Sequence, residues 1–149
     1  MFGGMLVASV RPLYADTDQM GVVNHAAALR WFEKARAEWL RRLGYTYREF
    51  ESTGLTLPVY EVQIRYHKPA YYDQLLNLEA RLELPGAVRV LFHYRVRDQE
   101  TGTLLVQGIT RHAVVNHQGR PQRMPETIRA ILQRGIEAQN LAQPETEQR

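Results

Sequence analysis

The chain contains no cysteine among its 149 residues, so it has neither a disulfide framework nor a thiol nucleophile. No apolar run approaches the ~20 residues that a membrane-spanning helix needs. The first residues lack the basic start and the cleavage site of a signal peptide. These absences predict a cytoplasmic protein without a membrane span, and the length fits a single domain that can bury a core of its own.

Further absences narrow the chemistry. A Gly-x-Ser-x-Gly elbow is missing, which argues against a serine hydrolase, and there is no glycine-rich phosphate loop or dinucleotide fingerprint. The formal net charge of +3 is only a mild basic excess, so we expect no nucleic-acid partner and at most a weak preference for an anionic ligand. We predict no metal site, because no metal-ligand spacing occurs among the five histidines, which are His25, His67, His93, His112 and His117.

The period of the apolar residues predicts one long helix near the N-terminus. We expect it over residues 26–43, with Asn24 as its N-cap and Gly44 as its C-terminal stop. The spacing of three and four predicts a buried face made of Leu29, Phe32, Ala35, Trp39, Leu40 and Leu43.

The rest of the pattern predicts strands and a short final helix. A first strand is expected over residues 6–14, three half-buried strands over 60–67, 76–83 and 88–97, and a more uniformly apolar, central strand over 104–115. Pro125 opens the last helix, and the chain is expected to fray from about Glu137. The prediction is an α+β domain over residues 1–136, in which an antiparallel sheet wraps a central helix, followed by a polar tail over 137–149. Edge pairing with a second copy predicts at least a dimer.

One stretch carries the chemistry. In Tyr14-Ala-Asp-Thr-Asp-Gln-Met-Gly-Val-Val-Asn-His25 a carboxylate, a glycine turn and a helix start follow one another closely. A helix start offers free N–H groups and a partial positive charge. An acid that faces such donors suits acyl transfer, because it can attack a carbonyl or activate water while the N–H groups hold the oxygen that gains charge. The alternative is that Asp16 and Asp18 are ordinary turn residues.

This stretch, followed by Leu29-Arg-Trp-Phe-Glu-Lys-Ala-Arg36, resembles the hot-dog-fold acyl-CoA thioesterases of the 4-hydroxybenzoyl-CoA thioesterase family, especially the branch that contains the Tol-Pal-associated thioesterase. The resemblance covers roughly residues 5 to 135. Later segments that agree with it are Ile64-Arg-Tyr-His-Lys-Pro-Ala-Tyr-Tyr-Asp-Gln-Leu75 and Gly108-Ile-Thr-Arg-His-Ala-Val-Val-Asn-His-Gln-Gly-Arg-Pro121.

The resemblance implies that Asp18 is the essential acid and that the backbone N–H of His25 polarises the thioester carbonyl. Asn24 departs from the aromatic or histidine that close relatives often carry, so contacts with the acyl group are expected to differ. No cofactor is implied, since coenzyme A is part of the substrate. Lys68 and Arg89 are candidates for its phosphates, with Arg65 and Arg120 behind them, although the better interpretation of each of the four is a solvated surface cation.

Three function classes stay open. An acyl-CoA thioesterase is favoured over a hot-dog dehydratase and over a non-catalytic acyl-CoA-binding protein. Trp31, Phe32, Tyr60 and Tyr66 are either an acyl tunnel or ordinary core. Pairing of two copies along a sheet edge is expected to place the site between the helix start of one subunit and the loop near Lys68 of the other, and the resemblance implies that such homodimers associate into a homotetramer.

Overall fold

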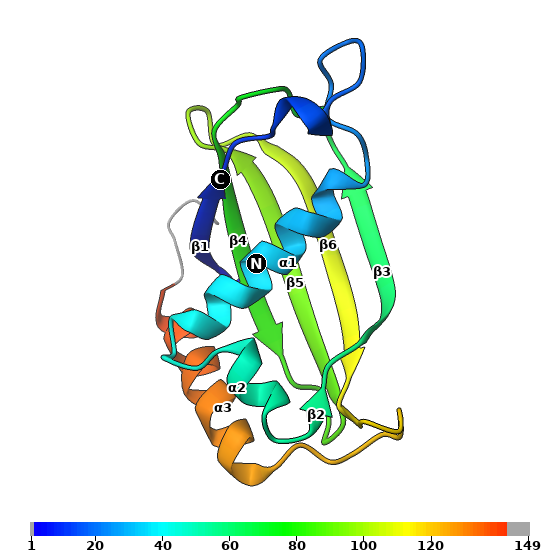
Figure 1. Cartoon of the computed structure of the whole chain (residues 1–149). Helices are drawn as coiled ribbons and strands as arrows, with labels where there is room; N and C mark the ends of the chain where they lie inside the picture. Colours follow the sequence, from blue (N-terminus) through cyan, green and yellow to red (C-terminus); the bar gives the residue numbers. More distant parts are fainter. Residues whose placement is uncertain (1, 143–149) are drawn as a thin grey trace.

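A computed structural model describes residues 2–142 and shows an antiparallel five-stranded sheet with a long helix across one face (Figure 1). The strand order in the sheet is β1-β4-β5-β6-β3, and a second sheet joins β2 to β7. The elements are β1 (Met5–Val10), the 3₁₀ turn η1 (Tyr14–Asp16), α1 (Ala27–Arg41), α2 (Tyr47–Glu51), β2 (Leu55–Thr56), β3 (Val59–Tyr66), β4 (Leu76–Glu83), β5 (Arg89–Asp98), β6 (Leu104–Ala113), β7 (Val115–Asn116) and α3 (Glu126–Leu141).

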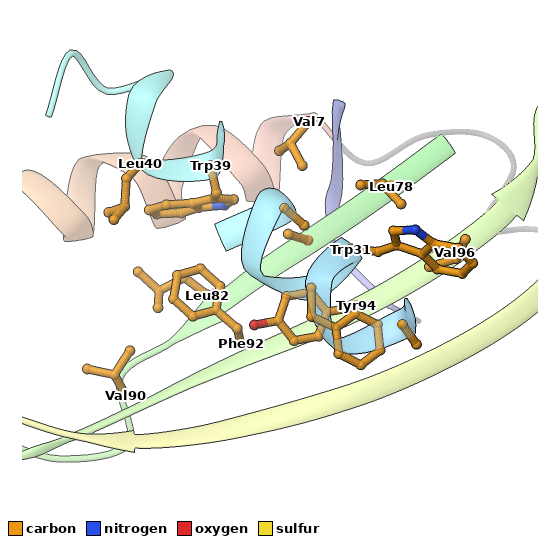
Figure 2. Packing of buried hydrophobic residues seen from close by; sticks show 14 of the residues in the cluster. Val7, Trp31, Trp39, Leu40, Leu78, Leu82, Val90, Phe92, Tyr94 and Val96 are labelled. Atoms are coloured by element: carbon orange, nitrogen blue, oxygen red, sulfur yellow. The ribbon is translucent and has the colours of Figure 1, made fainter. Parts of the chain in front are cut away.

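The core lies between α1 and the sheet. Figure 2 shows Trp31, Trp39 and Leu40 of the helix packed among side chains of β4 and β5. The predicted helical face is correct except that Leu29 is exposed and Trp31 is buried in its place. The helix is also shorter than expected at both ends, because Ala26 is its cap residue and the chain turns after Arg42.

The helix comes very close to the sheet at one point. A Cβ added to Gly108 of β6 would lie 2.6 Å from the Phe32 ring, a separation that real atoms do not tolerate. Phe32 in turn stacks on Tyr94 of β5, with ring centroids 4.2 Å apart and planes 5° from parallel. The missing side chain at Gly108 therefore sets how deeply α1 sits against the strands.

The C-terminal half of α1 contacts α3 through a buried hydrogen bond. Trp39 Nε1 donates to Gln139 Oε1 at 3.1 Å. The same amide pairs with the Leu82 backbone, accepting from its N–H at 2.9 Å and donating to its carbonyl at 2.8 Å. Gln139 is buried and hydrogen-bonded inside the domain, and α3 continues to Leu141, so the expected fraying from Glu137 is wrong as far as that residue. The remainder of the predicted tail, residues 143–149, lies outside the described residues.

Several strand expectations need correction. The first strand ends at Val10, because Pro12 cannot join a ladder and the chain then enters η1. The predicted strand 104–115 is divided into β6 and β7, and the centre of the sheet is β5. β3 is an edge strand and not half-buried: only Ile64 in it is partly covered. Within residues 2–142, no helix combines the length and the apolar character that crossing a bilayer requires.

Candidate active site

Asp18 lies at the base of a tight loop that β-type pairing closes. Thr17 and Val23 form an antiparallel bridge, and the Asp18 N–H donates to the Val22 carbonyl at 2.9 Å. Gly21 makes the bend with a φ of 77°. Asp18 Oδ1 accepts from the N–H groups of Met20 at 2.8 Å and Val22 at 3.1 Å. Its Oδ2 accepts no hydrogen bond from any described residue, so one exposed oxygen is oriented and available.

Asp16 has the opposite environment although it is only two residues away. Its side chain is buried, forms an ion pair with Arg30 and accepts the Leu13 N–H at 2.8 Å through Oδ2. Its carbonyl oxygen receives both the backbone N–H and the side-chain amide of Asn24, each at 2.8 Å. Asp16 therefore holds the loop to the helix, and Asp18 is the acid that is left open to a ligand.

The start of α1 leaves two backbone donors unpaired. Asn24 Oδ1 accepts the Ala27 N–H at 3.1 Å, so Asn24 does cap the helix although Ala26 is the formal cap residue. In the part of the chain that the structure describes, neither the His25 N–H nor the Ala26 N–H has a hydrogen-bond acceptor. Both donors lie at the positive end of the helix dipole and can bind an oxygen that gains negative charge.

Tyr66 fixes the position of His25. The Tyr66 hydroxyl donates to the His25 carbonyl at 2.6 Å, and the two rings pack with centroids 4.5 Å apart. Burial raises the pKa of Tyr66 above its usual value, so the phenol keeps the proton that it donates. This contact between β3 and the segment before α1 holds the peptide whose N–H is unpaired.

A cavity of about 250 Å³ opens beside these groups. His25, Asn24 and Lys68 contribute its polar lining, and the apolar lining includes Ala28, Trp31 and Val106. Of the four aromatic candidates, Trp31 and Tyr66 line this cavity, Phe32 is core, and Tyr60 lies elsewhere. Lys68 lines this cavity from the same chain as His25, and the expectation that a second subunit supplies that loop stays a prediction. The arrangement can hold an acyl group against the helix start.

Arg89 is not part of this cavity. It begins β5 opposite Ala113, whereas Lys68 follows β3 and its N–H donates to the Leu105 carbonyl at the other end of the sheet. The Arg89 guanidinium donates to the Tyr60 hydroxyl at 3.2 Å and lies 5.8 Å from the centre of the Tyr60 ring. About eight residues of extended strand, roughly 26 Å, separate the two cations within one chain.

A second polar cluster is buried under α1, away from the cavity. His112 Nδ1 lies 3.0 Å from the Leu57 carbonyl, which can only accept, so this nitrogen carries the proton. Nε2 then accepts from Thr110 at 2.8 Å, Thr110 accepts from Tyr94 at 2.6 Å, and Tyr94 accepts from Arg36 at 3.2 Å. Burial lowers the pKa of His112 to about 4 and raises that of Tyr94 to about 12, so both are neutral.

Sequence reasoning proposed Asp18, His25, Asn24 and Lys68 as site residues but gave no role to the Ala26 N–H. A second free donor at a helix start is a general property of helix ends, so the same argument could have found it. Among residues 2–142, no three histidine or acidic side chains come together in a way that could hold a metal ion.

Comparison with known proteins identifies the family. The sequence model of the thioesterase-like superfamily matches residues 12–132. The putative acyl-CoA thioesterase YneP of Bacillus subtilis is 30% identical over 105 residues, which cover 70% of this chain and 75% of YneP. The acyl-CoA thioesterase YbgC of Haemophilus influenzae is 39% identical over 88 residues, 58% of this chain and 65% of its own length.

The structure agrees with these sequences. The DHNA-CoA thioesterase of Staphylococcus aureus superposes with a TM-score of 0.80 at 25% identity, covering 90% of this chain and 91% of the other. The expected α+β hot-dog fold is therefore confirmed. The chain belongs to the thioesterase-like superfamily, as an enzyme of the acyl-CoA thioesterase type.

Proposed function

We propose that the protein hydrolyses an acyl-CoA thioester, with Asp18 as nucleophile or general base and the N–H groups at the start of α1 as the oxyanion site. The observation that carries this proposal is that Asp18, whose Oδ1 is held by two N–H groups while its Oδ2 accepts none from a described residue, is followed within eight residues by the unpaired N–H groups of His25 and Ala26. Each such donor typically contributes about 3 kcal/mol to the stabilisation of an oxyanion.

Two routes fit this arrangement. In one, Asp18 Oδ2 attacks the thioester carbon, the CoA thiolate leaves and takes up a proton, and water then hydrolyses the mixed anhydride to the free acid and Asp18. In the other, Asp18 takes a proton from water, which attacks the carbon directly, and CoA leaves with that proton. In both routes the carbonyl oxygen becomes an oxyanion next to the His25 N–H.

The cavity suggests the size of the acyl group. A cavity of 150 Å³ is enough to bind benzene, and the space beside His25 measures about 250 Å³ with Trp31 in its lining. We infer that it takes an aromatic or short aliphatic acyl group. The Staphylococcus aureus structural relative, a DHNA-CoA thioesterase, supports an aromatic acyl group. Asn24 lies in the same lining, so changing it is expected to redistribute preference among acyl groups.

We further propose that two copies pair along β3. This edge strand exposes apolar side chains on Val59, Tyr60, Val62 and Tyr66, and an unpaired edge of this kind favours association. In a two-fold antiparallel pair, the start of β3 in one copy lies opposite its end in the other. Such pairing brings the partner's Arg89 toward Lys68, so both cations can bind one coenzyme. Association into a tetramer follows from the family resemblance only.

The pairing is tested by light scattering and by kinetics. A mass near 17 kDa at working concentration contradicts the dimer. Lys68→Gln and Arg89→Gln should each raise KM for every acyl-CoA by a similar factor, leave kcat nearly unchanged and weaken the dependence of KM on salt. If KM is unaltered at low ionic strength, the two residues are surface cations and the Asp18 proposal is unaffected.

The reaction itself is tested with Asp18→Asn, which keeps the shape of the side chain and removes its basicity. Free CoA release from a panel of acyl-CoAs should fall at least ~100-fold with an unchanged melting temperature. Asp73→Asn is the matched control, because Asp73 is an exposed acid on a nearby loop whose φ of 64° asparagine tolerates. Asp16→Asn is expected to lower stability, since it removes the partner of Arg30.

Wild-type activity in Asp18→Asn would overturn the assignment. Binding of acyl-CoA by the wild-type protein without release of CoA would instead identify a non-catalytic binding protein.

A further inference from the structure

Two cavities lie along the contact between α1 and the sheet, and within residues 2–142 they share no lining residue. The reaction cavity, beside His25, has Ala28 and Val106 in its lining. The inner cavity lies farther along α1, where Arg36 and His112 belong to its lining, and measures only about 10 Å³, the space of roughly one water molecule. The rest of the inner lining is largely apolar and includes Leu40, Leu57, Leu82, Val90, Phe92 and Leu132.

Phe32 lies between these cavities along the helix. Side chains four residues apart share one face of a helix, so Ala28, Phe32 and Arg36 follow one another on the same side of α1. Ala28 lines the reaction cavity and Arg36 lines the inner cavity. Phe32 lines neither of them and is 1% exposed. Its ring therefore fills the space between the two.

The sheet beneath α1 has the same arrangement. Alternate residues of β6 face the helix: Val106 lines the reaction cavity, His112 lines the inner cavity, and Gly108 is the first position on that face after Val106. Gly108 stands opposite Tyr94 of β5 in the sheet register. The Phe32 ring lies flat on the Tyr94 ring, with centroids 4.2 Å apart, and covers Gly108 so closely that a Cβ there would lie 2.6 Å from it. Helix and sheet thus meet without a gap at this one layer.

The layer is held in place on its sheet side. Tyr94 is buried, and its hydroxyl forms a 2.6 Å hydrogen bond with Thr110. This bond fixes the ring on which Phe32 is stacked. In Figure 2, Tyr94 lies between Trp31, which lines the reaction cavity, and Phe92, which lines the inner cavity. The two cavities are therefore separated by a packed pair of rings.

We propose that Phe32, stacked on Tyr94, is the inner wall of the acyl site and determines the longest acyl group that the enzyme accepts. This inference rests on the proposed function, because it places the acyl group in the reaction cavity. A chain that reaches the wall cannot bury further methylene groups, so affinity stops rising at that length. A smaller side chain at residue 32 extends the reaction cavity toward the apolar inner cavity.

The test measures how affinity depends on chain length in the wild type, in Phe32→Leu and in Phe32→Ala. The probes are alkyl-CoA thioethers with linear chains of increasing length, which cannot be hydrolysed, and calorimetric titration gives Kd for each. In the wild type, each added methylene should tighten binding about fourfold until the chain reaches the wall, and further methylenes should have no effect. In Phe32→Leu the gain of about fourfold per methylene should continue beyond that length, and in Phe32→Ala it should continue at least as far.

Phe50→Leu is the matched control. Phe50 is 2% exposed in the same core and lines neither cavity, so this variant makes the same substitution away from the wall. Its affinity should stop rising at the wild-type chain length. A general loosening of the core would change the affinity for all chain lengths by a similar factor, whereas loss of the wall changes it only for the long ones. Circular dichroism establishes that each variant is folded, and Phe32→Leu decides the point if Phe32→Ala does not fold.

Two results overturn the wall: equal limiting chain lengths in the wild type and Phe32→Leu, or the same extension in Phe50→Leu. A wild-type affinity that rises without a limit overturns it as well. Release of CoA from linear acyl-CoAs separates this outcome from failure of the proposed function. If the wild type hydrolyses acyl-CoAs and Phe32→Leu has the same chain-length limit, the proposed function stands and the wall does not. If the limit for thioethers moves in Phe32→Leu while the wild type hydrolyses no acyl-CoA, the wall stands and the proposed hydrolysis does not.

Discussion

The two ends of α1 differ in how completely their polar groups are paired. At the C-terminal end, Gln139 satisfies both Trp39 and the backbone of Leu82 inside a closed core. At the N-terminal end, the His25 and Ala26 N–H groups have no partner in residues 2–142, and His25 borders an open cavity. One rigid helix thus joins a region that stabilises the fold to a region whose donors are left for a ligand.

The largest expected effect comes from removing one donor at the open end. His25→Pro eliminates the N–H at a position just before the helix, where proline is tolerated, while His25→Ala removes only the ring. CoA release should fall about 100- to 1,000-fold in His25→Pro and only slightly in His25→Ala. Steady-state kinetics on both variants, with circular dichroism to confirm folding, decides the point. Equal activities would remove the N–H from the mechanism.

A somewhat smaller effect, on stability, is expected at the closed end. Gln139→Ala leaves the Trp39 N–H and both Leu82 backbone groups buried without partners, which should lower the free energy of unfolding by about 3 kcal/mol. Urea denaturation measures this, and Gln133→Ala on an exposed position of the same helix should change it by less than about 0.5 kcal/mol. Activity per folded molecule should stay unchanged in both. A large loss of kcat in Gln139→Ala would mean that the two ends are not independent.

The smallest effect appears only in acid and involves His112. Its pKa is about 4 in the folded state and 6.5 in the unfolded chain, so between these values the unfolded state binds a proton that the native state does not. The stabilisation is complete above pH 7 and falls as the pH drops, by about 2 kcal/mol at pH 5. Urea denaturation at pH 7 and pH 5 should show this loss in the wild type, and His112→Gln should reduce it. An identical pH dependence in both proteins would show that His112 is not its source.

The sequence predicted the parts of the molecule that local chemistry controls. The order of the main strands and helices, the central helix and the glycine turn after Asp18 follow from periodicity, capping and turn residues within a few positions of each other, whereas the short elements α2, β2 and β7 were not predicted. The difference in environment between the two acids did not, because it depends on Arg30, which comes within reach of Asp16 only after the helix forms.

The errors have a common physical origin in contacts over long sequence distances. The polar end of α3 was read as a frayed tail because its burial depends on Trp39, 100 residues away from Gln139. The alternation in β3 was read as one buried face, but the strand lies at the edge of the sheet in a single chain. Lys68 and Arg89 lie at opposite ends of the sheet within one chain, so their joint binding of a coenzyme stays a prediction that depends on the pairing of two copies.

Gly108 illustrates how the geometry of the proposed site can depend on a residue outside it. The Phe32 ring occupies the space that a side chain at residue 108 would fill, so this strand position determines how closely α1 approaches the sheet. The His25 peptide lies just before the start of the same helix. A side chain at residue 108 would therefore push α1 away from the strands and shift this peptide relative to Asp18. If Asp18 and the His25 N–H act together as proposed, residue 108 influences their alignment without touching either of them, and even a single methyl group there should disturb it.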